Sequence, residues 1–248
     1  MSVTEKDRRP GGLRLGERIR LQLDSGWTLA ALGIALVLLA PSLTVLWSLT
    51  APASENWAHL RSTVIPGYIS NTLQLMALVA AITAVVGVGT AWLTVSAEFP
   101  GRHIFNWALV LPLATPAYIV AYVYTDLLSF AGPVQTALRG VTGWQVGDYH
   151  FPAVRSLPGA AVMLSLVLYP YVYLLARTSF ERQSAALFDA ARILGAGPMR
   201  AFLRVTLPCA RPAIAGGLAL VLMETISDFG VVDYFAVPTL TAGIFRTW

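Results

Sequence analysis

The sequence predicts an all-α protein that crosses a membrane several times, and both its composition and its long uncharged stretches indicate this. Hydrophobic residues make up 56% of the 248 residues and charged residues only 12%, and the mean hydropathy is +0.65. Soluble domains carry about twice this share of charged residues. The composition excludes a disordered chain, which needs low hydrophobicity and high net charge. The single cysteine, Cys209, excludes a scaffold of disulfides within the chain.

Five stretches with few or no charged residues predict the membrane-spanning helices. The first four have the roughly 20 mostly apolar residues that a spanning helix needs, and they lack the alternation of barrel strands. We therefore expect about five transmembrane helices, near residues 27–49, 68–96, 104–129, 157–177 and 211–230. The transmembrane domain would cover 27–248, behind a basic tail over 1–26. The first apolar stretch is too long, and too far from the N-terminus, for a cleaved signal peptide.

The distribution of lysine and arginine predicts the orientation. With the N-terminus in the cytoplasm, the tail and the long loop over 178–210 lie inside and carry most of the basic residues, in agreement with the positive-inside rule. The basic residues expected outside are Arg61, Arg139, Arg155 and Arg246. The net charge of +4 therefore reflects topology, and no nucleic-acid partner is expected. The tail either lies on the membrane surface, since apolar residues are interleaved with its bases, or only sets the orientation.

The long cytoplasmic loop contains a motif with fixed spacing. Residues 189–191 read Asp-Ala-Ala, Gly195 follows after three residues, and Val-Thr-Leu-Pro over 205–208 follows after nine more. Physically, the loop has the pattern of two short helices around a break. Gly195 and Gly197 can supply the positive φ of a helix end, and Pro198 suits the first turn of the second helix.

This loop resembles the EAA motif in the membrane subunits of binding-protein-dependent ABC importers. That motif reads Glu-Ala-Ala, three residues, Gly, nine residues and Ile-x-Leu-Pro. The chain departs from it by Asp189 in place of Glu and Val205 in place of Ile. The resemblance implies a type I importer-like fold, in which the loop docks on a separate ATP-binding subunit and couples to it. The residues that it assigns to this coupling are Asp189, Ala190, Ala191, Gly195, Gly197, Leu207 and Pro208.

The resemblance also implies partners and a location. The partners are two copies of the ATP-binding subunit, a periplasmic solute-binding protein, and either a second permease half or an identical partner chain. The protein would be a multi-pass protein of the bacterial inner membrane, surrounded by lipid, and not an enzyme. Lys6 is the only lysine and no Gly-x-x-x-x-Gly-Lys-Ser/Thr phosphate loop surrounds it, so ATP hydrolysis falls to a partner chain. No cofactor or metal is expected, because the three histidines fall in three different loops.

A second interpretation of the loop stays open. In the helix expected near 198–206, Phe202 and Val205 share one face, and Arg200 and Arg204 lie on another. A helix pair of this kind could rest on the bilayer surface without contacting a partner protein.

Three further stretches resemble the ferric-iron importer permeases: 168–177, 223–235 and 241–248. This narrower resemblance implies iron as the solute, whereas permeases for thiamine, polyamines, sulfate or phosphonate remain alternatives. Iron permeases of this family are about twice as long and have two homologous halves. We therefore expect the chain to be an N-terminal half or a fragment, with a half-size subunit that dimerises as the alternative.

Two acidic residues are expected inside the fifth span. Glu224 and Asp228 are four residues apart, so on one helix they would share a face. Carboxylates at this depth are costly unless they are paired, hydrated or protonated. They could line a path for a hard cation such as ferric iron, or Glu224 could be hydrogen-bonded between helices while Asp228 caps the outer end. A proton-coupled secondary transporter that uses both as a relay is the alternative from another functional class, and it would not need the coupling loop.

Overall fold

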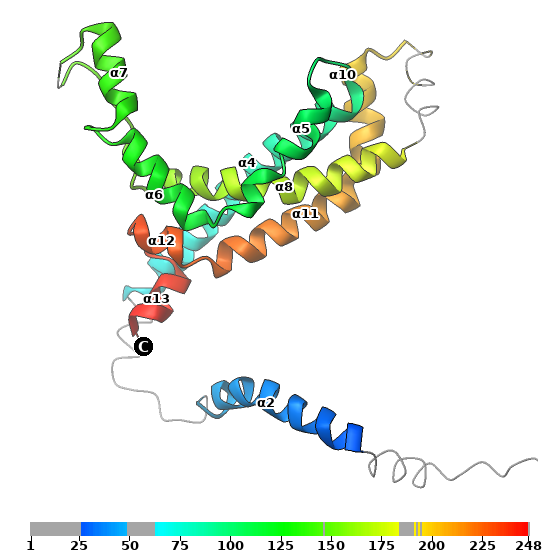
Figure 1. Cartoon of the computed structure of the whole chain (residues 1–248), viewed down its shortest axis with the longest axis vertical. Coiled ribbons are helices and arrows are strands. Elements are labelled where there is room, and N and C mark those ends of the chain that lie inside the picture. The colour runs from blue at the N-terminus through cyan, green and yellow to red at the C-terminus, as the bar shows by residue number, and fades with distance from the viewer. Residues whose placement is uncertain are drawn as a thin grey trace, which may run out of the picture. The chain divides into compact units, whose positions relative to one another are not determined.

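The computed structural model describes residues 26–48, 63–145, 147–183, 191, 193 and 195–247, which form helices joined by short turns. The chain divides into two compact units, residues 1–57 and 58–248. In the first unit, the described residues form one helix, α2 (Gly26–Ser48). The other described helices belong to the second unit (Figure 1).

Three long helices form the core of the second unit: α4 (Ile65–Ser96), α8 (Leu157–Arg182) and α11 (Leu207–Ser227). They run side by side in Figure 1, and α8, which packs against both of the others, is the most buried of them. Two glycines allow this close approach. A Cβ atom added to Gly87 of α4 would lie 2.8 Å from the Cβ of Val172, and one added to Gly217 of α11 would lie 2.9 Å from the Cα of Val172. The middle of α8 is therefore packed tightly from two sides.

The prediction of a single helix near 104–129 is wrong. The chain instead forms three pieces there, namely α5 (Arg102–Ala108), the 3-10 turn η1 (Leu111–Ala114) and α6 (Ala117–Leu128). Two prolines explain the break, because Pro112 and Pro116 have no backbone N–H to donate within a helix. Thr115, which precedes Pro116, is held in an extended conformation with φ −107° and ψ 125°.

Within the described residues, four stretches are long and apolar enough to cross a membrane, and a bent pair of helices would be a fifth. The four are Gly26–Ser48, Ile65–Ser96, Ala117–Thr142 and Leu157–Arg182. The bent pair consists of Pro198–Cys209 and Arg211–Ser227, which meet at 70°. The expectation of about five spans is confirmed, with three changes of boundary. The third stretch begins at Ala117, α8 continues past the expected end at 177, and α11 ends at Ser227 and not near 230.

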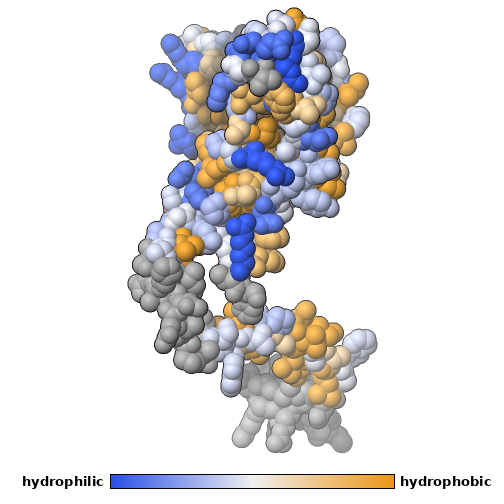
Figure 2. Space-filling view, turned by 90° about the vertical axis from the view of Figure 1, so that its left-hand side faces the viewer, coloured by the Kyte–Doolittle hydropathy of each residue, from blue (hydrophilic) through white to orange (hydrophobic). Residues whose placement is uncertain are grey.

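Shorter helices lie at the two ends of the three-helix core. At one end are α6, α7 (Pro133–Thr142), α12 (Gly230–Tyr234) and α13 (Leu240–Thr247), and at the other are α5 and α10 (Pro198–Ala201) (Figure 1). The end with α7 is the expected outer end, and the end with α10 is the expected cytoplasmic end. Figure 2 views the second unit from the α7 end, where hydrophilic side chains gather between patches of hydrophobic ones.

The C-terminal helix α13 is fastened to the start of α4. The Asn71 side chain donates a 3.0 Å hydrogen bond to the carbonyl of Pro238, and the backbone N–H of Leu240 donates a 3.1 Å bond to the Thr72 hydroxyl. Gly243 also lies directly against the Tyr68 ring. These contacts close this end of the bundle, the expected outer end, around the N-terminus of α4.

Candidate functional site

The first part of the cytoplasmic loop ends in a tight, hydrogen-bonded turn at Gly195. Ala191 is helical, and its carbonyl accepts a 3.0 Å bond from the backbone N–H of Ala196. Gly195 between them has a φ of +82°. A bond from the residue after a left-handed glycine back to the carbonyl five residues earlier is the outer bond of a Schellman motif, which ends helices. The predicted positive φ at Gly195 is thereby confirmed.

The other glycine of the motif has an ordinary backbone conformation. Gly197 has a φ of −64°, so the prediction that it also supplies a positive φ is wrong. It instead occupies the N-cap position in front of α10, which begins at Pro198 as expected. Asp189 and Ala190 lie outside the described residues, so their assignment to coupling stays a prediction.

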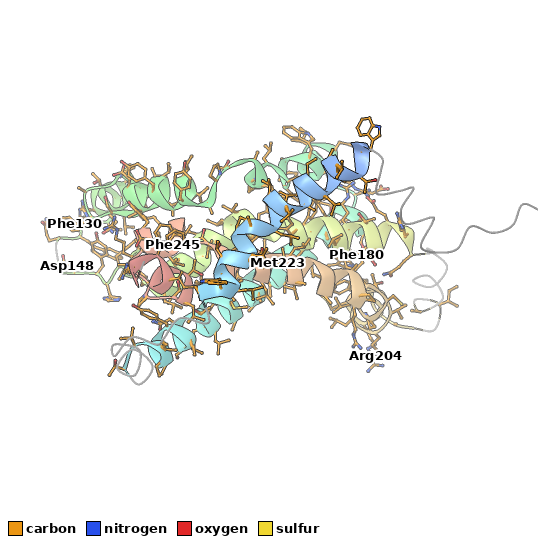
Figure 3. The ribbon with its side chains drawn as sticks, turned by 90° about the horizontal axis from the view of Figure 1, so that it is seen from below. Phe130, Asp148, Phe180, Arg204, Met223 and Phe245 are labelled. Atoms are coloured by element: carbon orange, nitrogen blue, oxygen red, sulfur yellow. The ribbon has the colours of Figure 1, made fainter. Side chains whose placement is uncertain are left out.

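The second helix of the loop joins the membrane helix directly. After α10, the segment η2 (Phe202–Thr206) forms a π-helix, in which the N–H of Leu207 bonds to the carbonyl of Phe202 five residues earlier. Leu207 and Pro208 then begin α11. The expected faces are present, since Phe202 is buried while Arg200 and Arg204 are exposed. Figure 3 shows Arg204 pointing away from the body of the molecule.

A polar cluster joins α5 to α8 at the expected cytoplasmic end, and the sequence analysis did not anticipate it. The Arg177 guanidinium and the Tyr173 hydroxyl both donate to the backbone carbonyl of Asn106, at 3.3 Å each. Arg177 also donates to the Tyr173 hydroxyl at 3.2 Å and pairs with Glu181 at 2.8 Å. Since Glu181 is half exposed, the ion pair adds little stability by itself. The cluster fixes the position of α5 against α8.

The prediction that Glu224 and Asp228 share one helical face is wrong. Helix α11 ends at Ser227, and Asp228 has an extended conformation with ψ 125°. Its carboxylate accepts bonds from the backbone N–H groups of Val231 at 2.9 Å and Val232 at 3.3 Å. Asp228 therefore caps the N-terminus of α12, and this capping competes with continuation of α11.

Glu224 lies within α11 and its side chain is exposed on the surface of the second unit. The ion pairs among the described residues are those of Arg177 with Glu181 and Arg246 with Asp233, so Glu224 takes part in neither. The exposed neighbours of Glu224 on α11 include the apolar residues Leu220, Met223 and Ile226, and Ser227 is exposed beside them. An acidic side chain on an otherwise apolar membrane helix requires water, a partner chain or a cation beside it.

The outer loop forms an ordered module around α7. The buried side chain of Gln135 donates to the carbonyl of Leu128 and accepts from the Tyr149 hydroxyl, both at 2.8 Å. Arg139 donates to the Tyr149 hydroxyl at 3.0 Å, and its guanidinium lies 4.3 Å from the centre of the Phe130 ring. Phe130, Gln135 and Tyr149 also border a hollow of about 490 Å³. The sequence analysis did not anticipate this network.

Within the described ranges, no group of three or more histidine, cysteine, aspartate or glutamate residues could hold a metal ion.

Comparison with known proteins gives one matching family and several relatives. The family model described as "Binding-protein-dependent transport system inner membrane component" matches residues 84–245. The molybdenum transport system permease protein ModB of Escherichia coli (strain K12) is 29% identical over 165 residues, which are 66% of this chain and 69% of ModB. The sulfate transport system permease protein CysT of Salmonella typhimurium (strain LT2) is 26% identical over 205 residues, 82% of this chain and 71% of CysT.

The fold also resembles solved structures. A chain of a bacterial ABC transporter involved in the import of the acidic polysaccharide alginate superimposes with a TM-score of 0.68. The match covers 92% of this chain and 86% of the other, at 19% sequence identity. At this identity the likeness concerns the fold.

Proposed function

The chain belongs to the family of binding-protein-dependent transport system inner membrane components, and we propose that its loop over 178–210 is the segment that couples it to an ATPase. The protein is a multi-pass permease subunit of an ABC importer in the inner membrane. It is not itself an enzyme, since the subunit that hydrolyses ATP is a separate chain. Its orientation, with the N-terminus in the cytoplasm, is part of the proposal and rests on the positive-inside rule.

The Schellman turn at Gly195 is the observation that carries the coupling proposal. The glycine of the motif is the residue with φ +82°, and the turn directs the chain from the first loop helix into α10. Ile193, next to this turn, is 85% exposed although it is a large apolar residue. This exposed apolar side chain lies beside the rigid turn, where a docking partner would reach it.

A photo-crosslinking residue at Ile193 tests this proposal. It should form a covalent adduct with the ATP-binding subunit in membranes that contain the assembled importer. The matched control is Val141, which is 88% exposed but lies in α7 at the opposite end of the molecule, and should give no such adduct. An adduct from Val141 and none from Ile193 would overturn both the coupling role and the orientation.

We also propose a second permease unit beside α11, either another half or an identical chain. Support comes from the exposed carboxylate of Glu224 among the exposed apolar residues of this helix. An interface that encloses a wet path would place Glu224 in contact with water and not with lipid tails. The same interface would cover the exposed Met223 and Ile226.

We propose ferric iron as the solute, on the basis of the sequence resemblance. Three sequence stretches resemble ferric-iron permeases, and an exposed carboxylate on α11 is compatible with a hard cation, which prefers oxygen ligands. The names of the relatives, molybdenum and sulfate transport permeases, favour an oxyanion instead. A proton relay through Glu224 and Asp228 is disfavoured, because Asp228 is engaged in capping α12.

Uptake measurements with the assembled importer separate these solutes. Cells that carry this permease with its own binding protein and ATPase would be offered radioactive ferric iron, sulfate or molybdate in turn. ATP-dependent accumulation of iron, abolished when the permease gene is removed, is the expected result. Accumulation of sulfate or molybdate under the same conditions would instead establish an oxyanion importer.

A further inference from the structure

The side chain of Phe202 packs the cytoplasmic loop against the helix bundle. It belongs to η2, and only 7% of it is exposed. Its ring stacks on Trp92 of α4, with ring centroids 4.5 Å apart and planes at 29°. Its ring also meets the edge of Phe180 of α8, with centroids 6.0 Å apart at 72°. One side chain of the loop therefore contacts two core helices other than the one that the loop continues into.

The surroundings of Phe202 leave little room for movement. Around this aromatic cluster lie the fully buried alanines Ala91, Ala176 and Ala210, one from each of the three core helices. Small residues let the helix backbones approach the rings, and a close-packed interior of this kind transmits displacement from one element to the next.

A hydrogen bond ties the two ends of the loop together near the same place. The side chain of Gln183, which directly follows α8, donates a 3.1 Å bond to the carbonyl of Thr206, the last residue of η2. These residues are 23 positions apart in the chain. The segment that leaves the bundle and the segment that returns to it are thus joined by a direct hydrogen bond.

The covalent connection between the loop and α11 is not straight and would transmit movement poorly by itself. Between α10 and the membrane part of α11 the chain passes through a π-helical turn and then bends by 70°. Interruptions of the regular α-helical bonding are where helices kink. A force applied to the loop would flex this junction unless contacts beside it make it stiff.

We propose that Phe202, Trp92, Phe180 and Gln183 form a mount that makes the loop move as one body with α4 and α8. Phe202 is its central positioning residue. This inference rests on the proposed coupling role of the loop and adds to it the route by which movement enters the bundle. Movement imposed by the ATPase reaches α4 through the Trp92 ring and α8 through the Phe180 ring, in addition to the covalent path into α11.

The test compares truncation of the mount with truncation of an exposed neighbour. The importer, reconstituted with its ATPase and binding protein, is assayed for solute uptake and ATP hydrolysis in the same vesicles. In Phe202→Ala, uptake per ATP should fall by about tenfold, a change within the range over which packed networks modulate coupling, while the ATPase still co-purifies. Leu203→Ala removes a side chain that is 52% exposed and should leave the ratio unchanged.

Two variants at Trp92 distinguish the contribution of its aromatic ring from that of its indole N–H group. The indole N–H of Trp92 is buried and has no hydrogen-bond partner among the described residues. Trp92→Phe keeps an aromatic ring against Phe202 and should stay coupled, whereas Trp92→Ala should behave like Phe202→Ala. An unchanged ratio in both alanine variants would overturn the proposal.

A cross-link supplies a test that does not depend on the stability of the alanine variants. A protein with Phe202→Cys, Trp92→Cys and Cys209→Ser should be uncoupled when reduced, and a short bifunctional thiol reagent should restore coupling by joining the loop to α4. Restored uptake per ATP supports the mount. A cross-linked importer that binds its ATPase and hydrolyses ATP but stays uncoupled overturns it, whereas loss of ATPase binding in the unmodified protein would overturn the coupling role of the loop instead.

Discussion

The turn at Gly195 gives a prediction in which the size of the effect follows from one backbone angle. An added Cβ at Gly195 would meet no atom of the described residues within 4 Å, so a substitution there creates no clash with them. The cost comes from φ +82°, which lies in the left-handed region. Residues other than glycine lose about 1–2 kcal/mol in this region, and β-branched residues are rarer still there.

This free-energy cost lowers the fraction of molecules in which the loop has the native turn at Gly195. A change of about 1–2 kcal/mol shifts an equilibrium by a factor of about 5–30. Gly195→Val should therefore reduce the fraction of loops that can dock on the ATPase, and uptake should fall by up to that factor. Membrane insertion should be unaffected, because the substitution lies in a loop outside the candidate membrane-spanning helices.

The matched control is Gly195→Asn. Asparagine enters the left-handed region several times more often than other residues with a side chain, so this variant should retain most of the activity although it also adds a side chain. The assay is solute uptake normalised to the amount of permease in the membrane, together with co-purification of the ATPase. Equal uptake in the valine, asparagine and parent proteins would refute the conformational argument, and equal loss in both variants would indicate a steric contact at Gly195.

Three further predictions concern orientation, packing and the translocation path. In a cysteine-free background, a cysteine at Asp148 should react with an impermeant maleimide in intact cells and one at Phe188 should not; the opposite pattern would reverse the orientation. Gly217→Ala should lower stability by about 1–3 kcal/mol, because its Cβ would lie 2.9 Å from the α8 backbone, whereas Gly216→Ala meets a leucine methyl at 3.8 Å and should not change thermal melting in detergent. Glu224→Gln should reduce uptake at an unchanged level of protein, and uptake that merely follows the amount of protein would show a structural role.

The membrane helices could be predicted from the sequence because their signal is local. Uncharged stretches of sufficient length indicate α2, α4 and α8 without any knowledge of the tertiary structure, and a shorter uncharged run indicates α11. The break before α6 also had a local signal, in Pro112 and Pro116, but hydropathy outweighed it in the expectation of one span. Two prolines close together in an apolar stretch therefore predict a break in the helix even where the average hydropathy predicts a single span.

The features of the candidate site that depend on neighbouring residues could be predicted from the sequence. Those that depend on contacts between residues far apart in the sequence could not. The left-handed glycine and the two faces of the second loop helix are local features, and both were predicted. The contacts of Phe202 with Trp92 and Phe180 were not, because Trp92 is more than a hundred residues away in sequence and nothing in a single sequence pairs the two rings. Asp228 was placed in the helix because spacing alone cannot show that a carboxylate caps the next helix.

The proline of the motif links the sequence pattern to the geometry of the mount. Pro208 has no N–H, so the carbonyl of Arg204 cannot receive the bond that an α-helix would place there. The preceding turn adopts the wider π register, in which Leu207 bonds back to Phe202. A π turn rotates the residues before it relative to those after it, and this rotation helps to set the direction of the Phe202 side chain. Phe202 packs on Trp92 of α4 and Phe180 of α8, the same two helices along which α11 packs, and the Leu-Pro ending of the motif thus positions the loop as well as starting the membrane helix.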